Sequence, residues 1–559
     1  MPSLLTHMRH GILAVLVALL VVLAGCASDG GNGLSGNGNG IGQNGVPTAA
    51  EMASGNGASG NVGVAAGGAQ DANVFRRNVE EGFVPQPTDV QPEGVYHDYY
   101  FETNLSAPCE ARFCAAYDRA VSEDPLSGER EQYLAVGLNS GITQAQLQRQ
   151  KLNLIVVLDT SGSMSSSFNR YYYDDGERKE VDETQSKMGA ATDAVGTLTR
   201  KLGADDRLAV VTYAGGADVA QPMARVGELD AAAVRQRIQN SHPDGGTNLA
   251  AGMDEAERIA NRYPGGGDNR TTRIVYVTDA MPNVGDTSKG GLGGTIDAQA
   301  ERGIHTTFVG VGVDFNSRLT DALADVKGAN YYSVKSPSAF EERMDEGFTY
   351  MVTPLAYNLS LSVEGDGYRV ASVHGAPSAG ADDEVSEGQD GAQLLHVSTL
   401  FPSRSQNGSG EGSVMLVELE RADAASDRTV TLTASYETPD GVQKVREKTV
   451  TFDDHTVPYY ESDGVRKAVV LTRYTTLMQN WAAHERAMAT GDEREVPEGV
   501  ESTDLGTWEQ QSVNLAVSEP YGERIATFRT YYEREMQALN ASRMEQDLTI
   551  LTKLDRLDE

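Results

Sequence analysis

The residues with the clearest chemical potential form a short polar motif, Asp159-Thr-Ser161-Gly-Ser163, directly after an apolar run. Carboxylate and hydroxyl oxygens are the ligands that hard divalent cations prefer. The motif alone has a second interpretation, because Asp and Ser also form loops and cap helices. Oxygen ligands elsewhere in the chain are therefore needed to distinguish a cation site from an ordinary loop.

Two distant segments supply such ligands. Asp244-Gly-Gly-Thr247 opens an amphipathic helical pattern, and Thr278-Asp279 closes an apolar run. Three hydroxyls and two carboxylates suit the near-octahedral shell of Mg²⁺ and leave room for water. We expect Mg²⁺, with Mn²⁺ or Ca²⁺ as alternatives, and an open position that accepts a carboxylate from a protein ligand. The predicted ligands are Asp159, Ser161, Ser163, Thr247 and Asp279.

These ligands are far apart in the chain, so a fold must bring them together. Residues 148–350 alternate apolar runs with helical patterns, which predicts an α/β fold with a doubly wound, mostly parallel sheet. Such sheets bind ligands at the carboxyl ends of their strands, so we expect the three motifs at one edge. The runs predicted as buried strands are Leu154–Leu158, Leu208–Val211, Ile274–Val277, Thr307–Val311 and the weaker Tyr331–Val334.

The order Asp-x-Ser-x-Ser, then Thr, then Asp resembles the metal-ion-dependent adhesion site of von Willebrand factor A domains, whose sheet is Rossmann-like. The resemblance covers residues 148–350 and implies that the three hydroxyls bind the cation directly. It also implies that the two carboxylates act mainly through bound water. One position departs from the family, because Ala280 stands where Gly usually follows the last Asp. We expect a backbone effect there without loss of a ligand.

The N-terminus has the pattern of an export signal. Arg9 and His10 precede an apolar run, Ile12–Ala24, which is shorter than the about 20 apolar residues of a membrane-spanning helix. The ending Leu-Ala-Gly-Cys26 resembles a lipobox, in which the cysteine carries a lipid; a chance cysteine is the alternative. Residues 1–25 are therefore predicted to be a lipoprotein signal peptide. The expected location is a membrane, as an exported, lipid-anchored protein of the outer membrane or cell surface.

Two segments separate this anchor from the α/β region. Residues 26–72 are rich in Gly, Asn and Ser, which predicts a disordered tether that reaches on the order of 40 Å. Residues 73–147 carry scattered aromatic residues and Pro, and we predict a β-rich lead-in. Phe75-Arg-Arg and the segment from Gly82 to Asp89 loosely resemble the lead-in of bacterial and archaeal surface lipoproteins with this domain.

The remaining two cysteines are close in the chain, in Cys109-Glu-Ala-Arg-Phe-Cys114. In an oxidising exterior such a pair predicts a disulfide with a small loop. Metal binding by these thiols is disfavoured, because no further thiol or imidazole stands nearby in the sequence.

After residue 350 the hydrophobic period changes. Alternation such as Leu359, Leu361 and Val363 predicts a β-sandwich-like domain over 351–456. Residues 457–559 are predicted to be a helical C-terminal region. Its apolar faces comprise Val470, Tyr474, Leu477, Met478 and Trp481, and then Ile525, Phe528, Tyr532 and Leu539.

Charge limits the partners. The formal charge is −34 and the pI about 4.6, which argues against nucleic acid or an anionic bilayer surface as partner. Only 11 of the 46 basic residues are Lys, as in proteins of salt-adapted (halophilic) organisms; an ordinary acidic secreted protein is the alternative. An insert over 165–186 emerges beside the predicted cation site. It is predicted either to shape partner choice or to be a solvated acidic loop.

These features favour a binding protein that acts in adhesion, envelope assembly or scaffolding. The first alternative is a metal-dependent hydrolase of the cell envelope, but the sequence has no His-Glu-x-x-His, Gly-x-Ser-x-Gly or phosphate-loop motif. The second is a structural domain with a vestigial site, against which the complete ligand set argues. We therefore expect no enzymatic activity.

The lipid anchor is testable by one substitution. Cys26→Ser removes the thiol that would carry the lipid, so the protein should leave the membrane fraction or accumulate unprocessed. Fractionation and mass measurement of the mature N-terminus check this. Unchanged fractionation of the variant would show that Cys26 does not anchor the protein.

Overall fold

The computed structural model describes the chain between residues 60 and 557, with gaps. Residues 1–59, with the predicted signal peptide and Cys26, lie outside the described residues, as do residues 175–185 of the insert and Asp244. The described residues are 60–174, 186–240, 245–265, 270–334, 336–345, 347–365, 367–377, 386–387, 393–421, 428–452, 455–490 and 507–557.

The α/β sheet has seven strands in the order β2-β11-β10-β9-β6-β7-β8. The strands predicted from the apolar runs pair in parallel, and β8 pairs antiparallel with β7. The predicted doubly wound, mostly parallel sheet is therefore confirmed. The five predicted strands are β6 (Lys151–Asp159), β7 (Arg207–Tyr213), β9 (Arg270–Thr278), β10 (Ile304–Val311) and β11 (Asn330–Val334).

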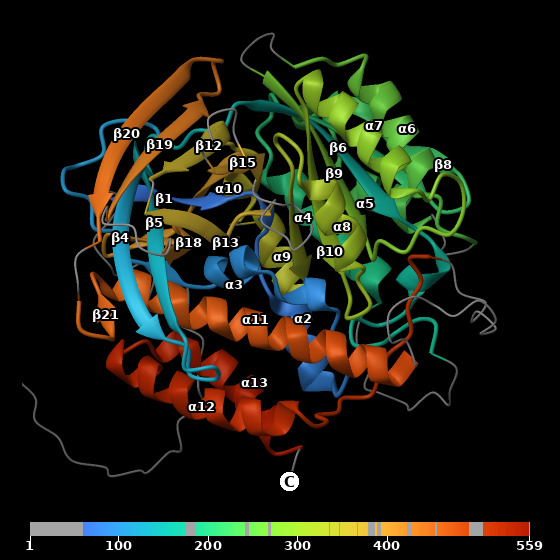
Figure 1. Ribbon diagram of the computed structural model, residues 1–559. Helices are drawn as coiled ribbons and strands as arrows, with labels where there is room; N and C mark the ends of the chain where they lie inside the picture. Colours follow the sequence, from blue (N-terminus) through green and yellow to red (C-terminus); the bar gives the residue numbers. More distant parts are fainter. Residues whose placement is uncertain are drawn as a thin grey trace, which may run out of the picture. The chain divides into compact units, whose positions relative to one another are not determined.

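Helices cover both faces of this sheet, because successive side chains of a buried strand point to opposite sides. Along β6, Leu154 and Val156 pack in one apolar core, whereas Ile155 and Val157 pack in another. The first core is closed by α4 (Lys187–Lys201), α5 (Ala231–Gln239) and α9 (Pro337–Asp345). The second is closed by α6 (Leu249–Ala260), α7 (Lys289–Glu301) and α8 (Ser317–Ala324) (Figure 1).

Strands that the sequence did not predict lie at both edges of the sheet. β8 (Ala217–Arg225) forms one edge, and β2 (Gly68–Ala69) pairs in parallel with β11 at the other. Together with β1 (Asn61–Ala66), β2 lies in the segment predicted as a disordered tether, so that prediction was wrong for residues 61–69. The segment is ordered because its small residues fit narrow spaces: a Cβ on Gly63 would lie 2.8 Å from the Gly410 Cα.

The first part of the predicted β-rich lead-in is helical, which corrects the prediction for residues 73–97. Helix α2 (Asn73–Glu81) buries Val74, Phe75, Asn78 and Val79, whose spacing of four residues places them on one helical face. Proline stands at the first position of each short helix that follows, where its missing N–H is not needed. These are the 3-10 helix η1 (Pro87–Val90) and α3 (Pro92–His97).

Strands of the lead-in and of the predicted β-sandwich share one antiparallel sheet, with the order β13-β18-β5-β1-β15-β12-β19-β20. Leu359, Leu361 and Val363 on β12 face its apolar core, as their alternation predicted. The strands are β4 (Cys114–Glu123), β5 (Arg130–Thr143), β12 (Ala356–Glu364), β13 (Tyr368–His374), β15 (Gln393–Ser403), β18 (Val414–Arg421), β19 (Thr429–Glu437) and β20 (Gln443–Thr451). Shorter strands are β3 (Tyr100–Phe101), β14 (Ser386–Glu387), β16 (Ser405–Gln406), β17 (Ser409–Glu411) and β21 (Tyr459–Tyr460).

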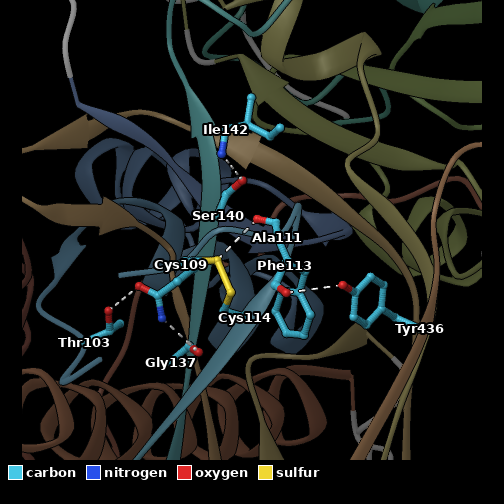
Figure 2. Close-up of a disulfide and its surroundings, with 10 residues drawn as sticks. Thr103, Cys109, Ala111, Phe113, Cys114, Gly137, Ser140, Ile142 and Tyr436 are labelled. Atoms are coloured by element: carbon cyan, nitrogen blue, oxygen red, sulfur yellow. Dashed lines mark hydrogen bonds between the residues drawn. A yellow bond between two sulfur atoms is a disulfide. The ribbon is translucent and has the colours of Figure 1, made fainter. Parts of the chain in front are cut away.

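The structure contains a disulfide between Cys109 and Cys114, at the start of β4 (Figure 2). Next to it, the Tyr436 hydroxyl donates a hydrogen bond to the Phe113 carbonyl at 3.3 Å. The two rings also meet edge to face. The bridge therefore fixes the loop that leads into β4 against the antiparallel sheet.

Three helices end the described chain: α11 (Asp463–Thr490), α12 (Tyr521–Ala538) and α13 (Glu545–Asp555) (Figure 1). The predicted apolar faces of α11 and α12 are buried, except that Leu539 is only partly buried. Their core also takes in residues of α2, α3, β5 and β18. Among the described helices, none has the length and apolarity that crossing a membrane requires.

A buried ion pair joins the two ends of the described chain. The Arg76 Nε on α2 donates to the Asp547 Oδ1 on α13 at 2.8 Å, and the Asp547 side chain is fully buried. Tyr99 and Tyr532 also donate their hydroxyls to Asp547. The carboxylate is thus held by charge-assisted hydrogen bonds, which are stronger than those between neutral groups.

We predict that Asp547→Asn lowers the free energy of unfolding by about 1–3 kcal/mol, because the buried Arg76 guanidinium loses one of its two carboxylate partners and keeps only Asp98. Urea unfolding measures this. The matched control is Glu420→Gln, which removes the same charge from the exposed Arg369–Glu420 pair and should change stability little. Equal losses in the two variants would contradict the prediction.

Candidate metal site

The topology brings the predicted ligands to one edge of the parallel sheet. Strands β6 and β9 are neighbours, and Asp159 and Asp279 stand at their carboxyl ends. After β6 the chain continues to α4 on one face of the sheet, and after β9 it continues to α7 on the opposite face. Connections that diverge in this way open a crevice at the sheet edge, which is where open α/β sheets bind ligands.

Asp159 is fully buried and both of its carboxylate oxygens accept hydrogen bonds. The Ser161 N–H donates to Oδ1 at 2.8 Å. The Thr278 and Tyr213 hydroxyls donate to Oδ2 at 2.7 and 3.0 Å. Asp159 is therefore oriented by the protein, and this arrangement suits a carboxylate that reaches a cation through water.

The serine hydroxyls converge on one point. Ser161 directly precedes the 3-10 helix η2 (Gly162–Ser165), Ser163 lies within it, and their Oγ atoms are 3.1 Å apart. Both residues are buried. Two hydroxyl oxygens at this separation can bind one ion, because each keeps a lone pair for it.

Thr247 is held at the same edge by its own loop. The Gly162 N–H donates to the Gly245 carbonyl at 3.3 Å, which joins this loop to the Ser161–Ser163 turn. The Asn283 side-chain oxygen accepts the Thr247 N–H at 2.8 Å, and the Thr247 side chain is buried. The neighbouring Asn248 caps α6 through the N–H of Ala251.

Asp279 provides the observation that tests whether a cation fits. Its side chain is fully buried, and its Oδ1 has no hydrogen-bond partner among the described residues. A buried carboxylate oxygen without a donor costs free energy, and most native structures avoid it. A divalent cation held by this donor set would satisfy that oxygen, either directly or through a bound water.

A fully buried lysine stands beside the predicted ligands. Lys187, the first residue of α4, donates from Nζ to Asp279 Oδ2 at 3.1 Å and to Asp314 Oδ1 at 2.5 Å. All three side chains have no exposed surface. Gly312 makes room for this cluster, because a Cβ there would lie 2.5 Å from the Lys187 Cε.

The electrostatics of the site disfavour carboxylate charge. Burial, and then the charge of Asp279, raise the pKa of Asp159 to about 6. Burial also raises the pKa of Asp314 to about 6, although Lys187 opposes the increase. The Lys187 ammonium pairs with Asp279 and Asp314, and a bound divalent cation would supply positive charge that favours the ionised forms of Asp159 and Asp314.

Ala280 shows the backbone effect expected where the family usually has Gly. Its φ angle is +57°, in the left-handed region that costs a non-glycine residue about 1–2 kcal/mol. The Thr278 hydroxyl accepts the Ala280 N–H at 2.8 Å. That hydroxyl also donates to Asp159, so the strained residue follows a turn that is fixed by hydrogen bonds.

Residues 154–281 match the von Willebrand factor type A domain family. This part of the chain contains a von Willebrand factor type A domain. Among curated proteins, "Uncharacterized protein YfbK" of Escherichia coli (strain K12) is 25% identical over 299 residues, which is 52% of this chain and 48% of YfbK. The chain thus matches about half the length of that relative.

Solved structures with this domain show a more distant likeness. A von Willebrand factor type A protein from Catenulispora acidiphila has 15% identity and a TM-score of 0.40, and covers 70% of this chain and 89% of that chain. The ArnB paralog VWA2 from Sulfolobus acidocaldarius has 13% identity and a TM-score of 0.36, with 79% and 98% covered. Because these TM-scores are low, we base the assignment of the fold on the family match and the strand order alone.

The sequence did not single out several residues that shape the site. Tyr213, Lys187 and Asp314 reach it from other elements, and no spacing pattern relates them to the predicted ligands. Thr278 was identified only as the neighbour of Asp279. Within the described residues, no group of three or more His, Cys, Asp or Glu side chains forms a metal cluster. The predicted ligand set differs from such a cluster, because three of its five ligands are hydroxyl groups.

We predict that Lys187→Met destabilises the von Willebrand factor type A domain by about 3–5 kcal/mol, because two buried carboxylates lose their counter-charge. Urea unfolding of the full chain measures the loss. Lys201→Met is the matched control at the other end of α4, where Lys201 pairs with Asp345 at the surface. A variant at position 187 as stable as the control would refute the role of this ion pair.

Proposed function

We propose that this protein is a cell-surface binding protein whose von Willebrand factor type A domain captures a protein ligand through a divalent cation. Domains of this type typically mediate protein interactions, which is the coarser function that the family match supports. The cation, the lipid anchor and the role in adhesion, envelope assembly or scaffolding are the finer parts of the proposal.

The observation that carries the proposal is the convergence of oxygen ligands around an unsatisfied carboxylate. Ser161 and Ser163 present their hydroxyls to each other, and Asp279 keeps a buried oxygen without a donor among the described residues. Hydroxyl and carboxylate oxygens are hard ligands, so Mg²⁺ is the expected ion, with Mn²⁺ or Ca²⁺ as alternatives.

The chemistry of the captured partner follows from this ligand set. The predicted ligands would leave part of the coordination shell open, and three of the five are neutral hydroxyls that do not cancel the charge of the cation. The five are Asp159, Ser161, Ser163, Thr247 and Asp279. The cation then keeps positive charge for an outside ligand. A carboxylate of a protein partner is the complementary group, and it would complete the coordination shell.

The proposed location is a membrane surface outside the cytoplasm. The N-terminal apolar run and Cys26 supply a lipid anchor in this proposal. The disulfide between Cys109 and Cys114 suits an oxidising compartment. A net charge of −34 keeps the protein off nucleic acid, so a protein partner and the lipid-anchored membrane are the contacts that we propose.

We predict that Mg²⁺ or Mn²⁺ raises the melting temperature, because the bound ion removes repulsion between Asp159 and Asp279. At 100 times the dissociation constant the stabilisation is about 2.7 kcal/mol. Thermal unfolding at constant ionic strength measures the increment, and calorimetry measures ion binding. Thr247→Ala and Asp159→Ala should each abolish the increment and the capture of partners from cell envelopes.

The matched control is Ser165→Ala, two residues beyond the motif, at the end of η2. Its hydroxyl donates to the Gly162 carbonyl at an exposed position, so removing it should leave ion binding intact. If calorimetry finds no divalent-ion binding to the wild-type protein, the proposed function is wrong.

A further inference from the structure

A segment of this chain, residues 507–515, lies along the face that carries the candidate metal site. Its first anchor is Trp508, which is 7% exposed and packs in the same apolar core as α6, α7 and α8. The Trp508 Nε1 donates to the Thr287 carbonyl, and the Asn316 amide donates to the Trp508 carbonyl, both at 2.7 Å. The guanidinium of Arg318 covers the ring at 5.0 Å.

The next residue, Glu509, points its carboxylate toward the site. Its Oε1 accepts the Tyr173 hydroxyl at 2.5 Å and the Asn283 Nδ2 at 2.6 Å. The other end of the Asn283 amide accepts the Thr247 N–H at 2.8 Å. A single amide group therefore separates the Glu509 carboxylate from the backbone of a predicted cation ligand.

The residues after Glu509 continue along the same face. The Gln510 side chain donates to the Asp314 carbonyl at 2.6 Å, beside the Lys187 cluster. The Gln511 side chain donates to the Tyr173 carbonyl, and the Ser512 N–H donates to Asp174, both at 2.8 Å. Tyr173 and Asp174 belong to the predicted insert, so the insert and this segment border the site together.

The carboxylate of Glu509 lies near other acidic groups, so its stability there depends on the charge at the site. Asp279 and Asp314 pair with the Lys187 ammonium, Asp159 lies at the same sheet edge, and Glu509 adds a further acidic group that is linked to Thr247 through Asn283. Like charges repel, so without a cation the acidic groups at this edge do not favour a further carboxylate beside them. With a divalent cation in place, the same carboxylate is attracted to the site.

We propose that Trp508-Glu509 is an internal ligand of the site: Glu509 presents to the cation the carboxylate that an outside partner must replace. The inference rests on the proposed function and deepens it, because it defines the partner. The partner is an extended protein segment in which an aromatic residue directly precedes an acidic one. The aromatic side chain takes the place of Trp508 beside Thr287 and Arg318, and the carboxylate takes the place of Glu509.

Hydrogen exchange on the full chain tests the internal ligand. Mg²⁺ should slow amide exchange in residues 507–515 about fivefold, because the cation adds an attraction that the segment must break to open. Glu509→Gln should lose this Mg²⁺ effect and still bind Mg²⁺ in calorimetry. Glu519→Gln, an exposed glutamate farther along the same connection, should respond like wild type.

A labelled peptide with the sequence of residues 507–512 tests the partner chemistry. With Mg²⁺ present, it should bind Trp508→Ala/Glu509→Gln about tenfold more tightly than wild type, a difference of about 1.4 kcal/mol. Fluorescence anisotropy measures the binding. The same peptide with Gln in place of Glu should show no dependence on Mg²⁺.

The outcomes separate this inference from the proposed function. If Mg²⁺ binds but residues 507–515 exchange equally with and without it, or if Glu509→Gln keeps the full effect, the internal ligand is refuted and the cation site stands. If Mg²⁺ does not bind the wild-type protein, the proposed function fails and the internal ligand fails with it.

Discussion

The constraint on which the site depends is the repulsion between acidic groups buried at one sheet edge. Parallel pairing of β6 and β9 brings Asp159 and Asp279 to that edge, and Asp314 joins them after β10. Each carboxyl group has lost water, so its charge must be compensated inside the protein. Lys187 supplies one positive charge to Asp279 and Asp314. The remaining acidic charge is what the proposed divalent cation would compensate.

The rest of the chain holds this edge from outside the sheet. On α2, the side chain of Asn78 donates to the Val313 carbonyl at 2.9 Å and accepts the Tyr171 hydroxyl at 2.8 Å. These bonds fasten the loop after β10 and the start of the insert to a helix that is itself tied to α13 by Arg76 and Asp547. Hydrogen bonds and an ion pair therefore connect the site loops, through α2, to the C-terminal helices.

Much of the fold could be predicted because its signals are local. Continuous apolar runs identify the five parallel strands, and period-two alternation identifies strands such as β12 and β19. Composition gave wrong predictions in two segments. The small residues at 61–69 suggested a tether, yet they form β1 and β2, because their small size lets them fit closely against neighbouring strands. Aromatic residues and Pro suggested strands at 73–97, although Val74, Phe75, Asn78 and Val79 have helical spacing.

The sequence by itself determined which ligands we predict, because the Asp-x-Ser-x-Ser turn, Thr247 and Asp279 each follow or precede a recognisable element. Only the tertiary structure decided what surrounds them. Lys187 meets Asp314 across 127 positions of sequence, and Glu509 meets Asn283 across 226. The physical reason is that hydrophobic periodicity is a local property of a strand or helix. Which loops meet at a sheet edge, and so which charges face one another, is set by packing of the whole chain.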